Sequence, residues 1–443
     1  MSATASNSNT VVITLRSPVN PVWFEDDILA QINLMPSSWA IDSVGGPTLN
    51  YANPVDAAKI FSFLDAAAKS VGSYATNPLW RTVDGPYKLT AFNSATGAFT
   101  LAPNPGYGGT HSTIYPTLQG VPYASDEAEF DAIKAGKIDV GQVPQDDLAQ
   151  IPDVEREGYN AFGAPDFGFN AIFYNFKDKT GDFGNIIGQL YIRQALASLE
   201  DEQEYIKDYY GGYGTFVYEP IPAAPNSPFT TPGAGIDPYP FSIAAAKELL
   251  TSHGWNVIAN GTDTCANSAG CGAGIPKGTK LTFNLISSTS PAYIGAEDKD
   301  FATEARQAGI DITLVPGNFT AMIVNDNDTV SSANDNAWAM EDFGGFTDNT
   351  YPTTDGVFNS TGPSNLGGYS DPTADELMNA SVSGSNSDAV ESELAYLASQ
   401  QPCLFQPEPD NIWVWKNTLS GTTNSFESLT QYQLEPQLWY LTK

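Results

Sequence analysis

The sequence predicts a mixed α/β fold that is divided into two or more lobes. Its 443 residues exceed the size at which one hydrophobic core keeps growing. A second observation is a strand–helix–strand pattern: residues 281–287 (LTFNLIS) indicate a buried strand, 300–308 a helix ending at Gly309, and 310–315 (IDITLV) another strand. This order and spacing are typical of a parallel βαβ crossover. Clefts between such lobes are where small ligands bind.

The first hundred residues alternate between strand and helix signals. Residues 10–16 (TVVITLR) predict a strand because β-branched residues alternate there. Asn53 and Pro54 supply a cap and a first-turn proline for a helix. The apolar positions of this helix recur at helical spacing, which predicts a core face made of Ala57, Ile60, Phe61, Leu64, Ala67, Ala68 and Val71. Two apolar runs around Gly97 (89–101, LTAFNSATGAFTL) predict a β-hairpin.

Three further helices are expected in the middle of the chain. Residues 126–135 predict a short helix, with Asp126 and Glu129 at capping-box spacing and Gly136 at its end. Residues 186–199 predict another, and 242–253 a third that is closed by Gly254.

The charge balance is strongly acidic. The chain has 51 Asp and Glu against 19 Lys and Arg, a formal net charge of −32 and a pI near 4.1. Such a surface repels nucleic acid, which excludes that class of partner. In an acidic medium the carboxyls approach their intrinsic pKa values of about 4 and the net charge shrinks. We therefore expect an acidic extracellular setting.

Three cysteines are too few for a disulfide framework. Cys265 and Cys271 bracket a Gly- and Asn-rich segment and could close a small disulfide loop. The alternative is two exposed thiols in a loop. Cys403 stands beside Leu404 and Phe405 and is expected to fill core space.

Catalytic and metal-binding motifs are missing from the sequence. The two histidines are His111 and His253, and the chain has no nucleophile elbow, phosphate loop, His-Glu-x-x-His pair or paired CxxC. We therefore predict no catalytic residues, no metal site and no cofactor. His253 is expected to cap a helix end.

Acidic and aromatic residues gather in one segment, 338–358. It contains Glu341, Asp342, Asp348 and Asp355 among the aromatic residues Trp338, Phe343, Phe346 and Tyr351. One interpretation is a solvated acidic loop beside core aromatics. The other is a pocket wall that grips a cationic group, since acids interleaved with aromatic rings suit such a ligand.

Several segments form a recognisable series along the chain: DGPYKLTAFN with LAPNPGYGG from Asp84, FDAIKAGKIDVGQVP, FYNFKD with YIRQALASLEDEQEYI, EPIPAAP with AAAKELLTSHGW, and YPTTDGVF with SNLGGYSDPTADELM. In this order they resemble segments of the extracellular solute-binding proteins for oligopeptides and dipeptides of ABC transporters (bacterial solute-binding protein family 5). No single motif is specific. Their order along nearly the whole chain carries the resemblance.

The resemblance implies a two-lobed fold of the periplasmic-binding-protein class II type, with a hinge. The family's first strands and leader would precede Thr10, so the first lobe is expected to be N-terminally incomplete. Residues 1–77 would form an accessory subdomain of the first lobe, 78–170 with 412–443 the principal lobe, and 171–411 the second lobe.

The resemblance also implies a function without turnover. The protein would bind peptides between its lobes and deliver them to ABC permease subunits, as a monomer outside the cell or in the periplasm, tethered to the membrane in its full-length form. By alignment from Pro352, Asp348 would meet the ligand's terminal ammonium. Trp338 and Phe346 would form neighbouring walls of the binding pocket, and Asp342 is the second candidate for the ammonium partner. The family has a tryptophan where this chain has Gly345. Asn365 and Tyr369 are expected to order the following loop.

Three alternatives stay open from sequence. A member of the same fold could bind oligosaccharides or metal chelates instead of peptides, or serve a receptor as a sensor. A secreted glycan hydrolase would need two carboxyls held about 5 or about 6.5–9.5 Å apart across a cleft.

Overall fold

The largest sheet has five strands, and the chain builds it from segments far apart in sequence. The computed structural model spans residues 1–443 and describes all of them except 8–9, 110–114, 324–337, 385–387, 423–433 and 443. The strands are, in spatial order, β13 (Asp311–Gly317), β12 (Thr282–Ser288), β14 (Met340–Thr347), β8 (Gly168–Tyr174) and β15 (Cys403–Gln406). Strand β12 runs parallel to β13 and β14, whereas β8 runs antiparallel to β14 and β15.

Helices cover both faces of this sheet, and β8 shows why its sequence suits that place. All seven of its residues are buried. Because successive side chains point to opposite faces of a strand, Ile172 and Tyr174 join one core while Phe169, Ala171 and Phe173 join the other. A strand buried at every position is expected where both faces of the sheet are covered.

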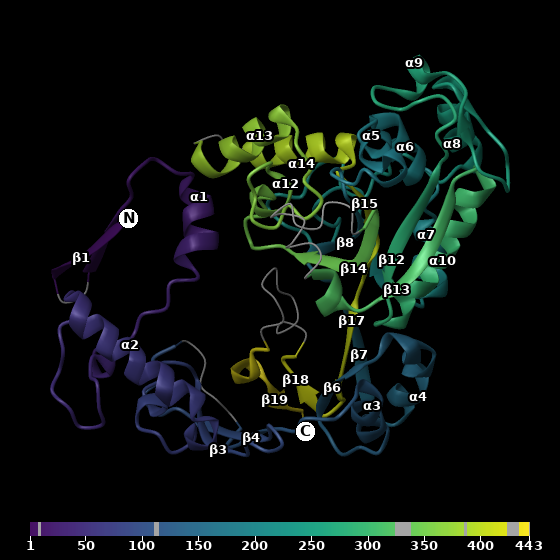
Figure 1. Ribbon diagram of the computed structural model, residues 1–443. Helices are drawn as coiled ribbons and strands as arrows, with labels where there is room; N and C mark the ends of the chain where they lie inside the picture. The colour runs from purple at the N-terminus through teal and green to yellow at the C-terminus, as the bar shows by residue number, and fades with distance from the viewer. Residues whose placement is uncertain (8–9, 110–114, 324–337, 385–387, 423–433, 443) are drawn as a thin grey trace.

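The first core lies under five helices: α5 (Phe183–Ile187), α6 (Leu190–Ala197), α8 (Ile243–Ser252), α9 (Ser268–Cys271) and α10 (Ala292–Gln307). The second lies under α12 (Asp355–Phe358), α13 (Pro372–Ser383) and α14 (Ala389–Gln400). We call the five-stranded sheet with these helices the five-stranded unit; it fills the upper part of Figure 1.

Two three-stranded sheets form the lower part of Figure 1, which we call the three-stranded unit. One has the order β6 (Val140–Val143), β17 (Asn411–Lys416), β7 (Tyr159–Ala164), and the other β3 (Tyr87–Phe92), β4 (Phe99–Pro103), β5 (Leu118–Gly120). Helices α3 (Asp126–Lys134) and α4 (Ile151–Arg156) pack on the first sheet, and β18 (Leu419–Ser420) pairs with β19 (Tyr440–Leu441).

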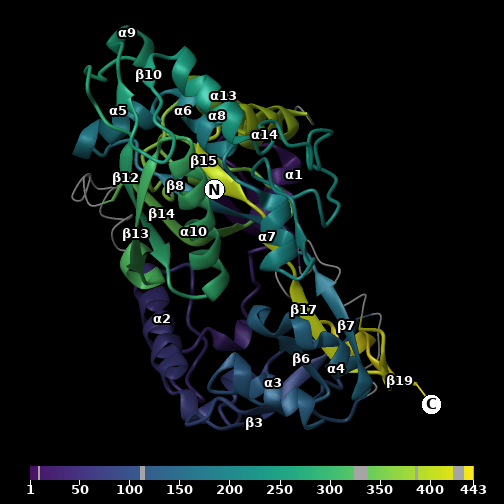
Figure 2. The same ribbon diagram turned by 90° about the vertical axis from the view of Figure 1, so that its right-hand side faces the viewer.

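The chain passes between the two units twice. It enters the five-stranded unit between β7 and β8, at residues 165–167, and returns between β15 and β17 through β16 (Glu408–Pro409). Strand β16 pairs with β9 (Gly214–Thr215), just after α7 (Glu202–Asp208). Figure 2 shows β7 and β17 side by side below α7.

The N-terminal segment lies to one side of the five-stranded unit in Figure 1 and touches it through residues of α1 and η1 and the residue that precedes them. It comprises a hairpin of β1 (Ser2–Asn7) and β2 (Thr10–Thr14), helix α1 (Pro21–Trp23), the wider turn η1 (Phe24–Leu29) and α2 (Pro54–Lys69). The Asn20 N–H donates to Val382 O of α13 (2.8 Å).

Most predicted elements are present. The 89–101 hairpin is β3–β4, and the βαβ unit is β12–α10–β13 with its strands adjacent and parallel. Helix α10 begins at Ala292, earlier than the predicted residue 300. The predicted helix 186–199 is interrupted after α5, because Gln189 has extended backbone angles (φ −82°, ψ 120°) before α6 begins.

Two local predictions are wrong. Helix α2 has the predicted Asn53 cap and Pro54, but no buried residue, and Phe61 is 71% exposed, so its apolar face is not core. The cap of α3 is Ser125, whose hydroxyl accepts from the Ala128 N–H. Glu129 forms no capping box; its Oε1 accepts from the Gln142 N–H of β6 (2.9 Å).

Candidate functional site

Asp348 lies where the five-stranded sheet meets the first crossing between the units. Strand β14 ends at Thr347, and the Asp348 N–H donates to the carbonyl oxygen of Phe167, within the crossing (2.7 Å). The Thr347 hydroxyl donates to Asp166 Oδ2, also in the crossing (3.5 Å). The backbone of the candidate anchor is therefore fixed to the segment that joins the two units.

The course of the β14 backbone just before Asp348 depends on two glycines. The pairing of β14 with β8 shifts register between Asp342 and Gly345, and Gly344 has a φ of +95°, which favours glycine. A Cβ on Gly345 would overlap the carbonyl oxygen of Phe169 in β8. Any side chain at position 345 would therefore meet the backbone of β8.

The Asp348 carboxyl is electrostatically unusual. The residue is half-buried, but its Oδ2 is buried and has no hydrogen-bond partner among the described residues. Burial raises the pKa of Asp348 well above its ordinary value, and the carboxyls of Asp166, Glu393 and Asp27 raise it further. Burial also raises the pKa of Glu408, with added repulsion from Asp166 and Asp348.

Three of these carboxyls, those of Asp348, Glu393 and Glu408, take part in no ion pair within the described part of the chain. A carboxyl taken out of water without a cation or a donor is held in its neutral form. A cationic group arriving beside Asp348 would supply the missing charge, and its binding would release protons.

Two of these neighbours come from distant segments. Asp27 of η1 accepts from the Tyr351 N–H (3.3 Å), and burial raises its pKa to about 7. Glu393 of α14 accepts from the N–H and hydroxyl of Thr354 (2.8 and 2.6 Å), and burial raises its pKa to about 7. Sequence reasoning missed Asp27, Glu393 and Glu408, because no local spacing relates them to Asp348.

The two predicted aromatic walls differ in position. Phe346, two residues before Asp348, is half-buried, with its ring centroid 6.1 Å from that of Phe169 and 5.7 Å from that of Phe173. Trp338 is 3% exposed and belongs to the second core. Their contact with a ligand stays a prediction.

Asp342 belongs to a different group of carboxyls. It is 1% exposed, its Oδ1 accepts from the Gly344 N–H (2.9 Å), and its carboxyl faces Asp298 of α10. The carboxyls that act on Asp348 are those of the crossing and of Glu393 and Asp27. The structure therefore does not bring the two predicted aspartates into one site.

The loop after the site is ordered as predicted. The Asn365 amide nitrogen donates to the carbonyl oxygens of Asn359 (2.9 Å) and Tyr369 (2.7 Å), and its Oδ1 accepts from the Tyr369 N–H (2.9 Å).

His253 and the adjacent acids Glu341 and Asp342 occupy different places in the fold. His111 lies outside the described residues, while His253 ends α8 and stacks on Tyr191 with ring centroids 3.9 Å apart. Glu341 and Asp342 are 0% and 1% exposed, so they do not face each other across a cleft. Within the described ranges, no group of three His, Cys, Asp or Glu residues is arranged to hold a metal ion.

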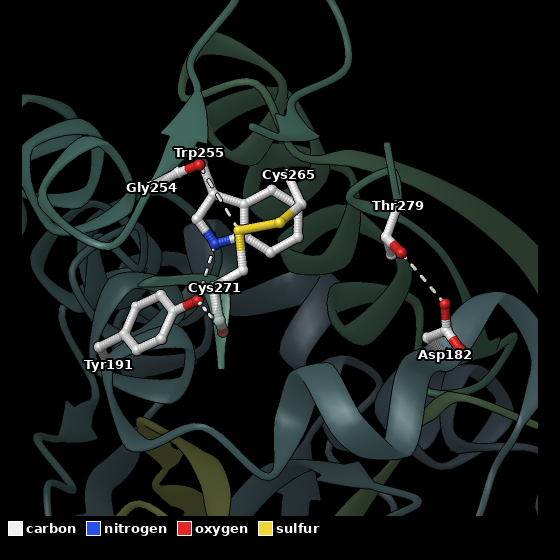
Figure 3. The surroundings of a disulfide bond; sticks show 7 residues. All are labelled: Asp182, Tyr191, Gly254, Trp255, Cys265, Cys271 and Thr279. Carbon is white, nitrogen blue, oxygen red and sulfur yellow. Dashed lines mark hydrogen bonds between the residues drawn. A yellow bond between two sulfur atoms is a disulfide. The ribbon is translucent and has the colours of Figure 1, made fainter. Parts of the chain in front are cut away.

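A disulfide joins Cys265 and Cys271, and Cys403 is a buried free thiol. Figure 3 shows Trp255 and Tyr191 beside the disulfide: the Trp255 Nε1–H donates to the Tyr191 hydroxyl, which donates to Cys271 O, both at 2.7 Å. The disulfide thus belongs to the outer end of the first core, remote in sequence from the candidate site.

A cavity of about 870 Å³ lies in the three-stranded unit, between its two sheets. Its wall includes Tyr115, Trp413, Lys416 and Trp439. These residues are not among those that act on Asp348.

No helix in the described portion of the chain has both the length and the apolar character needed to span a bilayer.

Comparison with known proteins agrees with this architecture. Residues 1–366 match the model of the bacterial extracellular solute-binding proteins, family 5 middle. Protein XP55 of Streptomyces lividans is 22% identical over 367 residues, 82% of this chain and 61% of that protein. The chain therefore spans less than two thirds of the length of this curated relative.

Two solved structures show the same fold. The oligopeptide-binding protein AppA of Bacillus subtilis, in complex with a nonapeptide, has a TM-score of 0.67 and 18% identity, covering 100% of this chain and 78% of AppA. NikA of Brucella suis, in complex with Fe(III)-EDTA, has a TM-score of 0.62 and 17% identity, covering 81% of this chain and 68% of NikA. Given the match over 1–366 and this shared fold, the chain belongs to the bacterial extracellular solute-binding proteins of family 5.

Proposed function

We propose that this protein binds short peptides through their free amino terminus, without cleaving them, and delivers them to the permease of an ABC importer. The observation that carries the proposal is the buried, unpartnered Oδ2 of Asp348 at the junction of the two units. A peptide's terminal ammonium has the charge and the donors that this atom lacks. The AppA complex with a nonapeptide, on the same fold, supports a peptide as the ligand.

The architecture suits binding by closure. The predicted lobes would correspond to the two units, with hinges at residues 165–167 and 407–410, where the chain crosses. A ligand held at a hinge-side carboxyl contacts both bodies only when they approach, so its binding favours the closed form. We place the protein outside the cell or in the periplasm, as a monomer tethered to the membrane in its full-length form.

The identity of the ligand class can be tested directly. Native mass spectrometry of the protein purified from its source would show whether a retained ligand has the mass of a peptide, an oligosaccharide or a metal chelate. The last of these is prompted by the NikA complex with Fe(III)-EDTA. A retained sugar or chelate would overturn the proposal.

The role of Asp348 is tested by calorimetry. Replacing Asp348 with Asn should weaken binding of a free-amine peptide by about 2 to 4 kcal/mol, the range for breaking a desolvated charge pair. The N-terminally acetylated peptide should bind the wild type poorly and be less affected by the substitution, which closes a double-mutant cycle. Glu391→Gln, an exposed carboxyl on α14, is the matched control and should bind normally. Equal affinity of Asp348→Asn and wild type for both peptides would place the anchor elsewhere.

A further inference from the structure

Helix α10 packs on the five-stranded sheet through carboxyl groups as well as apolar side chains. It lies against β12, β13 and β14, as Figures 1 and 2 show. Its buried residues recur at helical spacing along one stripe: Ile294, Glu297, Asp298, Phe301 and Ala305. This stripe is the core face of an amphipathic helix, in which acidic residues are rarely found fully buried. Glu297 is 2% and Asp298 0% exposed.

The partner of Asp298 across this interface is another carboxyl. Asp342 of β14, opposite Ser287 of β12 in the sheet, faces Asp298, and each carboxyl acts on the pKa of the other. With both groups ionised, Asp342 Oδ2 and both Asp298 oxygens would be buried acceptors without a donor. A carboxyl donates only when it is protonated. A proton on Asp298 therefore completes the interface, while Asp342 accepts it and the Gly344 N–H together.

The surroundings carry more acid and no compensating base. Titratable and polar groups face the pair from the elements packed around it. The helices and the segments that follow them supply Glu297, Tyr293 and Asp300 of α10, Glu200 after α6, Glu202 and Tyr205 of α7, and Tyr210 after α7. The sheet supplies Ser287 of β12 and Gln406 of β15. Lys, Arg and His do not occur among the described groups that act on this pair. Like charges this close cannot all ionise in a dry interior.

A fourth buried carboxyl extends the group. Glu200 is 5% exposed, neither of its carboxyl oxygens has a hydrogen-bond partner among the described residues, and the carboxyls of Glu297 and Asp342 raise its pKa further. The Gln406 side chain, 1% exposed, acts on both Glu200 and Asp342, and its Nε2 has no hydrogen-bond partner in the same part of the chain. We call Glu200, Glu297, Asp298 and Asp342 the proton cluster.

We propose that the proton cluster is a proton-binding site built into the fold, which fastens α10 to β14 in acidic medium and loosens it as the protons leave. The ligand is the proton itself, and the site is separate from Asp348. The proposal is independent of the peptide-binding function, since it concerns stability and not affinity.

The sign of the effect follows from burial. Desolvation raises the pKa of all four carboxyls above the value each has in the unfolded chain. The folded protein therefore holds more protons than the unfolded chain at intermediate pH. Its stability is complete below the unfolded pKa values of about 4 and is lost as the pH rises through the folded values.

Thermal unfolding against pH tests this at the level of the whole chain. The wild-type unfolding temperature should be highest near pH 4 to 5 and fall by more than about 10 °C by about pH 8, because several groups contribute together. Asp298→Asn supplies a permanent donor to Asp342 and should make this decline shallower. Glu248→Gln, an exposed carboxyl on α8, should keep the wild-type slope.

If Asp298→Asn does not fold, two measurements on the wild-type protein test the same proposal. Infrared difference spectroscopy in D₂O should show protonated carboxyls in the folded protein near pH 6.5, where model carboxyls of pKa about 4 are ionised. Hydrogen exchange, corrected for its intrinsic pH dependence, should accelerate in α10 as the pH rises. An unfolding temperature that stays level or rises from pH 5 to 8, or the absence of protonated carboxyls at pH 6.5, would overturn the proposal.

Discussion

Gly345 illustrates how the absence of a side chain at one residue decides the shape of the candidate site. Its missing Cβ lets β14 approach Phe169 O of β8, and no flexible side chain is available there to yield. We predict that Gly345→Ala lowers the free energy of unfolding by about 3 kcal/mol or more, because backbone must move to relieve the overlap. Urea denaturation measures this.

Gly356 is the control for that prediction. It lies in α12, and a Cβ there meets nothing within 4 Å. Gly356→Ala should change stability by no more than about 0.5 kcal/mol, or raise it slightly through helix propensity. Equal losses in the two variants would show that the close approach at Gly345 is not what limits that position.

The candidate site could be predicted only in part from these residues. The prediction of Asp348 as the anchor rests on its spacing before Pro352, a local signal. Asp27 and Glu393, whose carboxyls act on Asp348, lie hundreds of residues apart from each other in sequence. Only the folded chain brings both of them near Asp348. The separation of Asp342 from Asp348 was also hidden, because it depends on the register shift before Gly345.

Among the contacts between elements, that of the N-terminal segment with α13 depends on hydrogen bonds that link Asn20, Tyr351 and Ser381. The Asn20 side chain donates to the Tyr351 hydroxyl (2.8 Å) and to Ser381 O (2.9 Å), and the Tyr351 hydroxyl donates to Ser381 O (2.8 Å). We predict that Tyr351→Phe costs about 1 to 2 kcal/mol, because it leaves buried partners unsatisfied. Hydrogen exchange in α1 and η1 should accelerate.

Tyr440→Phe provides the comparison, since Tyr440 is 48% exposed. It should leave both stability and exchange unchanged. If Tyr351→Phe behaves in the same way, then the hydroxyl does not hold the N-terminal segment on α13.

The disulfide loop is the second element whose behaviour can be predicted. Cys265 and Cys271 are separated by six residues, so the loop is short and its chain-entropy stabilisation is modest, about 2 kcal/mol. Thiol counting under denaturing, non-reducing conditions should find one reactive cysteine, Cys403, and three after reduction. Three thiols before reduction would contradict the disulfide.

Helix α2 shows why element patterns predict helices better than they predict burial. Asn53, Pro54 and the 3.6-residue period are local, and the helix forms where they place it. Whether its apolar face is buried depends on tertiary packing, which the local pattern does not contain. In the structure Ile60 and Leu64 are only half-buried. The βαβ unit forms as predicted because β12 and β13 pair in parallel and α10 packs on both, although only β12 has buried residues.

At the scale of the whole molecule, two chain crossings join units that have separate cores. The core of Phe130, Ile133 and Val414 belongs to the three-stranded unit, whereas β8 and its two cores belong to the five-stranded unit. Separate cores allow each unit to move as a body, because relative motion leaves both cores intact. Length and pattern predict two or more lobes, and the family resemblance predicts their boundaries at 170/171 and 411/412; the pairing of β7 with β17 places both of these strands in the three-stranded unit.

A rigid-body hinge makes a prediction for the shape of the protein in solution. If a peptide bound at Asp348 draws the two units together, then small-angle X-ray scattering should give a smaller radius of gyration with saturating free-amine peptide than without it. The N-acetylated peptide lacks the charge that closure would enclose, so at the same concentration it should leave the scattering unchanged. Asp348→Asn should scatter like the unliganded wild type in the presence of either peptide. If calorimetry shows tight peptide binding and the radius of gyration does not change, then the two units do not close on the ligand, and the function would depend on a preformed site instead of a hinge.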